Sequence, residues 1–138
     1  MYAAPLRQTV LLTIACLIAS CNTLLGGIDP LADSRWSLEM LGSEPVIEDR
    51  APTLHFSDGR VGGSAGCNSF QGAYSVSGEM ITFNDLAMTL MACPDAQGVM
   101  EQERKFFTAL QDVDRFEISE SHLSLITSQG TELVFTRQ

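Results

Sequence analysis

The side chains that could carry chemistry are concentrated around one glycine-rich segment, residues 66–74, which reads GCNSFQGAY. Its Cys67 could serve as a nucleophile, a metal ligand, one half of a disulfide or only part of a tight turn. Ser64 lies just before it among further glycines, and the chain has two histidines, His55 and His122. Because a serine or cysteine nucleophile needs a base and an orienting group, these residues are the first test of whether the protein is an enzyme.

Their spacing argues against catalysis. The run GGSAG around Ser64 is not followed by the helix pattern of a nucleophile elbow, and it lacks the lysine of a phosphate-binding loop. His55 falls on the polar phase of a strand pattern and His122 lies beside a turn, as ordinary surface histidines do. The acidic pair Glu48-Asp49 lies in a loop pattern, where carboxylates are usually solvated. We therefore predict no catalytic residues, no cofactor and a protein that is not an enzyme.

Residues 1–20 have the pattern of an export signal. Arg7 is followed by the apolar run Val10–Ile18 and then by Ala19, Ser20 and Cys21. The run is too short for a bilayer span, which needs about 20 residues. The last four residues of the pattern, 18–21, resemble a bacterial lipobox, so we expect a lipoprotein signal peptide over 1–20 and lipidation of Cys21, whose several acyl chains would hold the protein on a membrane. The alternatives are a plain secretory signal cut nearby and a buried helix.

The next segment, residues 21–34, lacks a periodic pattern and contains Gly26, Gly27 and Pro30, so it predicts a lipidated tether before a domain over 35–138. Asn22 follows the lipidated position, which by resemblance to lipoprotein sorting favours the outer membrane, facing the periplasm. The chain has a net charge of −9, and cleavage after residue 20 would remove Arg7 and no acidic residue, giving −10. This charge makes nucleic acid a poor partner.

Four cysteines are present, of which Cys16 would leave with the signal and Cys21 would be acylated. Cys67 and Cys93 remain, 26 residues apart, in a domain expected to be exported, where thiols tend to form disulfides. Closing such a loop is worth about 3–3.5 kcal/mol on the chain-entropy estimate. The alternatives are two free buried thiols or a metal site. Because no CxxC occurs and both histidines are isolated, we predict the disulfide and no metal.

Most of the domain alternates apolar and polar residues with the period of half-buried strands, beginning with Trp36, Leu38 and Met40. Short strands with turn signals at about ten-residue spacing predict a mainly β, α+β fold: an antiparallel, strongly curved sheet or small open barrel. The exception is 95–113, where one helical face is shared by Val99, Glu103, Phe106, Leu110 and Val113, and Asp95 could be the N-cap. We expect Met100 and the following phenylalanines to pack in the core, and residues 86–93, LAMTLMAC, to bury one of two faces.

The chain resembles the META domain family, of the type of the HslJ-like heat-shock lipoproteins, over about residues 35–136. The resemblance rests on the GCNxFxGxY and LAMTxMxC segments, and on Trp36-x-Leu38, Glu103, Phe106-x3-Leu110 and Leu123-x-Leu125. Within these segments the family motif consists of Gly66, Asn68, Phe70, Gly72 and Thr89, to which we assign structural roles. No catalytic residues are established for the family.

This resemblance implies a compact antiparallel β-domain with one helix, located in the bacterial envelope. It links the chain to heat-shock and envelope stress and to tolerance of novobiocin-type drugs. We expect the protein to act through binding of an envelope protein or an apolar ligand, at residues that the sequence does not reveal. The alternatives are a lipid or hydrophobic-ligand carrier, a secretion-pilot-like protein with a hydrophobic groove, and a periplasmic enzyme or enzyme inhibitor.

Overall fold

The computed structural model describes residues 27–94 and 97–138. The predicted signal peptide, the lipidation site Cys21 and the helix-cap candidate Asp95 lie outside these residues. No helix in the described ranges is long and apolar enough to cross a membrane. The elements in chain order are β1 (Ser34–Leu41), β2 (Glu44–Pro45), the 3₁₀ turn η1 (Glu48–Arg50), β3 (Thr53–Ser57), β4 (Arg60–Ser64), β5 (Ser69–Ser77), β6 (Met80–Met88), α1 (Val99–Gln111), β7 (Val113–Ile118), β8 (His122–Thr127) and β9 (Glu132–Arg137).

Eight of the strands form a closed antiparallel barrel. Neighbouring strands pair in the order β1-β3-β4-β5-β6-β7-β8-β9, and β9 pairs back with β1, where Leu38 lies opposite Phe135. The short β2 adds to β1 outside this ring through Met40 and Pro45. The predicted mainly β fold with one helix is confirmed, and the curved sheet closes into a barrel.

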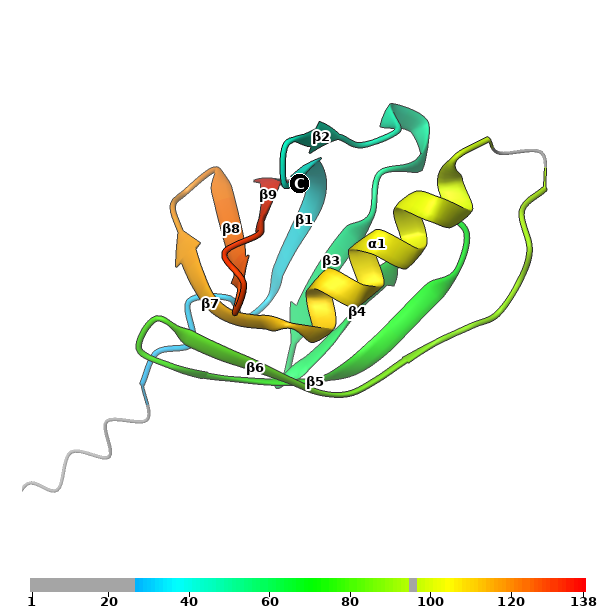
Figure 1. The fold of residues 1–138 in the computed structure, drawn as a ribbon. Coiled ribbons are helices and arrows are strands. Elements are labelled where there is room, and N and C mark those ends of the chain that lie inside the picture. Colours follow the sequence, from blue (N-terminus) through cyan, green and yellow to red (C-terminus); the bar gives the residue numbers. More distant parts are fainter. Residues whose placement is uncertain (1–26, 95–96) are drawn as a thin grey trace, which may run out of the picture.

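The pairing of neighbouring strands is weakest between β6 and β7, which are joined by a single residue pair. Met80 and Arg115 form the pair that joins these strands, supported by the N–H of Phe116, which donates to the Glu79 carbonyl at 2.9 Å. The chain between the two strands forms α1, which lies across this side of the barrel (Figure 1). Its Phe106 is fully buried in the barrel core, and burial of such a side chain stabilises by about 1.5–3 kcal/mol. The helix therefore closes the side that strand pairing leaves open.

The interior is filled by large side chains. The largest that are fully buried include Trp36, Phe56 and Phe135, and Tyr74 packs edge-on against Phe56 with ring centres 4.8 Å apart. These residues come from strand positions that alternate with less buried ones, because successive side chains of a strand point to opposite faces. An eight-stranded barrel is just wide enough for side chains to fill it.

The folded domain begins earlier than residue 35. Leu31 is fully buried, and its carbonyl accepts a hydrogen bond from the Ser34 hydroxyl at 2.5 Å. That hydroxyl in turn accepts from the indole N–H of Trp36 at 2.7 Å, and Asp29 accepts from the phenol of Tyr74. Residues 29–34 are thus part of the domain and not of the predicted tether, because Leu31 has a place in the core that a composition pattern does not reveal.

The helix is shorter than predicted. It runs from Val99 to Gln111, with Gly98 in the N-cap position at φ +79°, a left-handed conformation that glycine adopts without strain. Val113 already belongs to β7. The helical face named from the sequence is otherwise confirmed, since Val99, Glu103, Phe106 and Leu110 are its buried residues.

Candidate functional site

The residues considered for catalysis do not come together. The Ser64 hydroxyl accepts a hydrogen bond from the N–H of Gly66 at 3.1 Å, and its hydrogen bonds in the structure involve no histidine. His55 is in β3 opposite Gly62, whereas His122 opens β8 with its Nδ1 2.8 Å from the Ser121 hydroxyl. The described residues contain no group of three or more His, Cys, Asp or Glu side chains suited to a metal ion.

The predicted disulfide is confirmed. Cys67 and Cys93 are bonded, with their Cα atoms 6.0 Å apart, a normal separation for a disulfide. The bond joins the turn between β4 and β5 to the segment that follows β6. The Cys67 sulfur is thereby occupied, and this residue is a structural anchor in the described fold.

A buried carboxylate organises the same turn from the helix side. Glu103 is 2% exposed, and its Oε2 accepts hydrogen bonds from the N–H groups of Cys67 at 3.0 Å and Asn68 at 2.6 Å. Its Oε1 accepts from the Asn68 side-chain amide, also at 2.6 Å. Burying a carboxylate is unfavourable unless it is hydrogen-bonded, so these three donors explain how an acidic residue occupies the apolar face of α1.

The Asn68 side chain connects Glu103 to the segment after β6 by hydrogen bonds. Its Oδ1 accepts from the Thr89 hydroxyl at 2.8 Å and from the N–H of Met91 at 2.6 Å, while its Nδ2 donates to the Met91 carbonyl at 3.0 Å. The side chain is 1% exposed and every polar atom of it has a partner. Glu103, Asn68, Thr89 and Met91 therefore form one hydrogen-bonded chain from α1 to the 88–91 segment.

The remaining motif residues have steric roles. Gly66 has φ +121°, a conformation that favours glycine. A Cβ at Gly72 would lie 2.7 Å from Leu86 Cδ2 and 2.8 Å from the Asn84 carbonyl oxygen, at the point where a register shift bends the pairing of β5 with β6. Phe70 is buried, and its ring centre lies 5.7 Å from that of Phe106 in α1.

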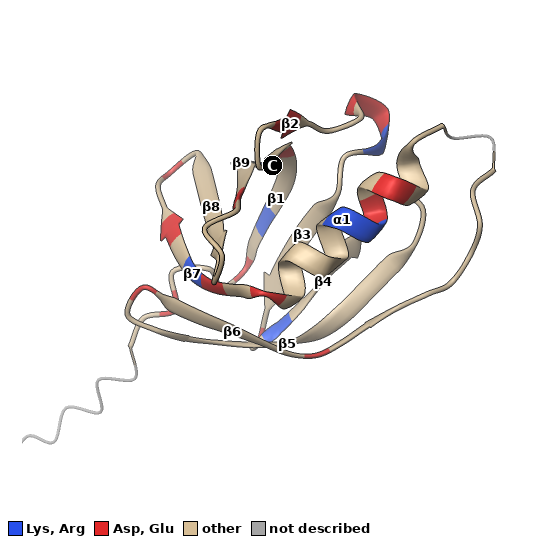
Figure 2. Ribbon diagram, viewed as in Figure 1, with Lys and Arg blue, Asp and Glu red and all other residues tan. Residues whose placement is uncertain are grey.

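Beside this network lies an apolar groove between α1 and the segment after β6. It has a volume of about 380 Å³, and its lining residues are Asn68, Met88, Leu90, Met91, Met100, Glu103, Arg104, Phe107 and Thr108. We call it the methionine groove. Leu90 is 92% exposed, Met91 59% and Met100 41%. The neighbouring segment 86–94 carries no charged residue, which Figure 2 shows as an unbroken tan stretch between β6 and the grey residues.

This groove corrects two sequence expectations. Residues 86–93 were expected to bury one face, but after Met88 the chain leaves the sheet, and its large side chains face solvent or the groove. Met100 was expected in the core, yet it lies in the first turn of α1 at the edge of the groove. The sequence signal for this groove was the uncharged run LAMTLM, which lies shortly before the start of the helix. A hydropathy pattern alone assigns such a run to the interior.

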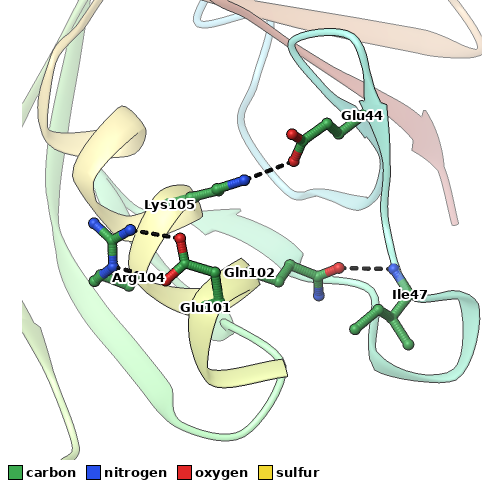
Figure 3. Close-up of polar contacts among 6 residues, drawn as sticks. All are labelled: Glu44, Ile47, Glu101, Gln102, Arg104 and Lys105. Carbon is green, nitrogen blue, oxygen red and sulfur yellow. Dashed lines mark hydrogen bonds and ion pairs between the residues drawn. The ribbon is translucent and has the colours of Figure 1, made fainter. Parts of the chain in front are cut away.

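A larger hollow, about 650 Å³, lies beside the C-terminal half of α1, between the β1–β2 turn and the β8–β9 turn. The two basic residues at its edge are ion-paired: Lys105 Nζ lies 2.8 Å from Glu44, and Arg104 pairs with Glu101 within the helix (Figure 3). Gln102 accepts the N–H of Ile47 at 2.7 Å and so fastens the loop before η1 to α1. The large hydrophobic side chains that are most exposed in the described residues do not line this hollow.

The comparisons with known proteins agree with this architecture. The sequence profile of the META domain matches residues 29–138. The matched range begins two residues before the buried Leu31. The chain belongs to the META domain family. The match also spans both motif segments and Glu103 of α1, which together hold the hydrogen-bonded cluster of Cys67, Asn68 and Glu103.

Two solved structures share the META domain fold of this chain at low sequence identity. An NMR structure of a protein from Burkholderia xenovorans is 25% identical with a TM-score of 0.68, over 78% of this chain and 83% of that one. A second NMR structure is 27% identical with a TM-score of 0.63, over 77% and 90%. A crystal structure of a DUF4847 family protein from Bacteroides vulgatus, 12% identical with a TM-score of 0.58, covers 78% and 94% and shows the fold alone. No curated protein matches the chain.

Proposed function

We propose that this META domain protein is a non-enzymatic binding protein of the bacterial envelope, which holds an apolar segment of another envelope protein in the methionine groove. In this proposal the lipid on Cys21 anchors it to the outer membrane, facing the periplasm. The binding supports tolerance of heat-shock and envelope stress and of novobiocin-type drugs, as the resemblance to HslJ-like lipoproteins implies. The observation that carries the proposal is the exposure of Leu90, Met91 and Met100 around one groove.

Single exposed apolar side chains scattered over a surface are ordinary, whereas a cluster of them at one place indicates a binding site. Of the five large hydrophobic residues that are well exposed in the described ranges, Leu90, Met91 and Met100 line this groove, whereas Ile28 and Met80 lie elsewhere. Such patches usually mark interaction sites. Methionine is suited to this role because its unbranched, polarizable side chain adapts to different apolar partners.

The groove is also held in a fixed shape before any partner arrives. The disulfide closes one end of the segment after β6 at Cys93, and Asn68 holds the backbone of Met91 through two hydrogen bonds. The facing wall is α1, whose position is set by the buried Phe106 and Glu103. A binding surface that is ordered in advance loses less conformational entropy on association.

The packing of the barrel argues against the carrier alternative in its simplest form. Trp36, Phe56 and Phe135 fill the interior and are fully buried, so the described barrel encloses side chains at the place where a lipid carrier would hold its ligand. A ligand of this protein would have to bind at the surface, and the methionine groove is one apolar site there.

The binding proposal is tested by photocrosslinking in intact cells. A photoreactive amino acid at position 90 is compared with the same amino acid at Met80, which is 48% exposed but does not line the groove. We expect one dominant crosslinked protein from position 90, lost on Met100→Asp, and none from position 80. The same products from both positions, or full stress survival of cells carrying Leu90→Asp with Met91→Asp, would contradict the proposal.

The anchoring part of the proposal has its own test. We expect Cys21→Ser to move the protein from the membrane fraction to the soluble periplasmic fraction, because removal of the acyl chains removes the attachment. The comparison is made with Cys16→Ser, which alters a residue of the predicted signal and leaves the lipidation site intact. If Cys21→Ser remains as membrane-bound as the unaltered chain, the protein is not held by a lipid at this residue.

A further inference from the structure

The methionine groove gathers sulfur atoms as well as apolar surface. Residues 27–138 contain five methionines, and Met88, Met91 and Met100 line this one groove, whereas Met40 and Met80 do not. The three come from three different elements: the end of β6, the segment after it and the first turn of α1. Thioethers from both walls of one groove can approach a common ligand.

The backbones that carry these side chains are each held separately. Met88 pairs with Phe70 in the β5–β6 ladder, Met91 is bonded through its N–H and its carbonyl to the Asn68 side chain, and Met100 is in the helix. The methionine side chain has three rotatable bonds, so sulfur atoms on fixed backbones can still converge. The arrangement combines a rigid frame with adaptable donor atoms.

The chemistry of these donors selects a particular class of ion. Thioether sulfur is a soft, uncharged ligand that prefers Cu(I), whereas imidazole and carboxylate favour zinc and harder ions. The groove also contains Asn68 and Glu103, but their polar atoms are engaged with each other and with Thr89, Met91 and Cys67. Arg104, the cationic residue of the lining, is paired with Glu101, and the net charge of the chain, −9, favours a cation.

We propose that Met88, Met91 and Met100 form a binding site for a soft monovalent cation, Cu(I) or its redox-inert analogue Ag(I). Thioethers carry no proton in the physiological range, so binding needs no deprotonation. The site shares Met91 and Met100 with the protein-binding role proposed above, but neither role requires the other. Replacement of methionine by leucine distinguishes the two, because leucine keeps the apolar volume and removes the sulfur.

The test is a titration with Ag(I) of the full chain carrying Cys16→Ser and Cys21→Ser, so that thiols do not compete, with the methionine methyl groups labelled for NMR. We expect the methyl signals of Met88, Met91 and Met100 to shift together and saturate at one equivalent. Met80 is the matched control, since it is exposed but lies outside the groove, and Met40 is a second. Equal shifts at Met80 and Met91, or no saturable shift, would overturn the proposal.

Affinity measurements complete the test. Anaerobic competition with a Cu(I) chelator should show that Met91→Leu with Met100→Leu weakens binding by at least about tenfold, since loss of even an outer partner of a metal ligand weakens affinity about 10- to 100-fold. Met80→Leu should bind as the parent does. Zn(II) should not compete. Unchanged Cu(I) affinity in the double variant, with the fold intact by circular dichroism, would place the metal elsewhere and refute the site.

Discussion

Loss of the Glu103 carboxylate should destabilise the domain far more than loss of any exposed acidic group. In Glu103→Ala the N–H groups of Cys67 and Asn68 and the Asn68 amide lose their acceptor inside the protein. Hydrogen bonds to a charged group contribute about 1.5–3 kcal/mol each, and the three are not independent. Each buried donor left without an acceptor costs about 1–3 kcal/mol, so for the three together we expect a loss of about 3–5 kcal/mol.

Glu103→Gln is a finer version of the same perturbation. The glutamine oxygen can keep the two backbone bonds to Cys67 and Asn68, but its NH₂ then faces the NH₂ of Asn68. A rotation of the Asn68 amide would relieve this clash and would break its two hydrogen bonds with the Met91 backbone instead. One donor remains unsatisfied in either arrangement, so we expect a loss of about 1–3 kcal/mol.

The assay is urea unfolding of the oxidised protein, followed by the fluorescence of Trp36, the single tryptophan, which is fully buried. A domain of this size is stable by about 5–15 kcal/mol, so the expected loss is a large fraction of the total. Glu101→Gln is the matched control, because it lies one half-turn earlier in α1, is exposed and pairs with Arg104. We expect it to leave the midpoint unchanged. If Glu103→Ala falls within about 1 kcal/mol of the parent, the assigned role of the carboxylate is wrong.

Three further perturbations test other parts of the fold. Reduction of the Cys67–Cys93 bond should lower the unfolding free energy by about 3.5 kcal/mol, measured by urea unfolding with and without a thiol reductant, and an unchanged midpoint would contradict this. Gly63→Ala should lower the unfolding free energy by about 3 kcal/mol or more, because its Cβ would overlap the main-chain carbonyl of Thr53. The loss should be seen as poor soluble yield or a low melting temperature. A normal melting curve would show that β3 and β4 can move apart at this point and would contradict the prediction. Burial and a hydrogen bond to a carboxylate raise the pKa of Tyr74 well above the usual value of about 10. The contribution of Tyr74 to the unfolding free energy should therefore be fully present below pH 10 and fall as the pH rises beyond it. Tyr74→Phe should remove that fall.

The local elements were predictable because their causes are local. The alternation around Trp36 and Phe70 reports which side chains face the core, since successive residues of a strand point to opposite faces. The face of α1 followed from helical spacing, including the place of Glu103 on it. What the sequence could not supply was a reason for an acidic residue on a buried face. That reason is Asn68, 35 residues away.

The boundaries and the site depended on distant contacts. Leu31 belongs to the domain because the core has room for it, and Met100 faces a groove because the segment after β6 leaves the sheet beside it. The hydropathy of Leu31 or Met100 predicts neither position, because an apolar residue has the same hydropathy in a core and on an exposed binding surface. The sequence predicted that these side chains are apolar, and the packing decided which of them remain uncovered.

The amino-acid sequence by itself determined the class of fold, the cysteine pair and the motif residues, because periodicity, residue type and spacing are local properties of the chain. Tertiary structure decided three things. It closed the barrel by pairing β1 with β9, it connected Glu103 through Asn68 to Met91, and it left the methionine groove open beside them. Each of these depends on which distant segments meet, and that is set by the free energy of the whole packed domain.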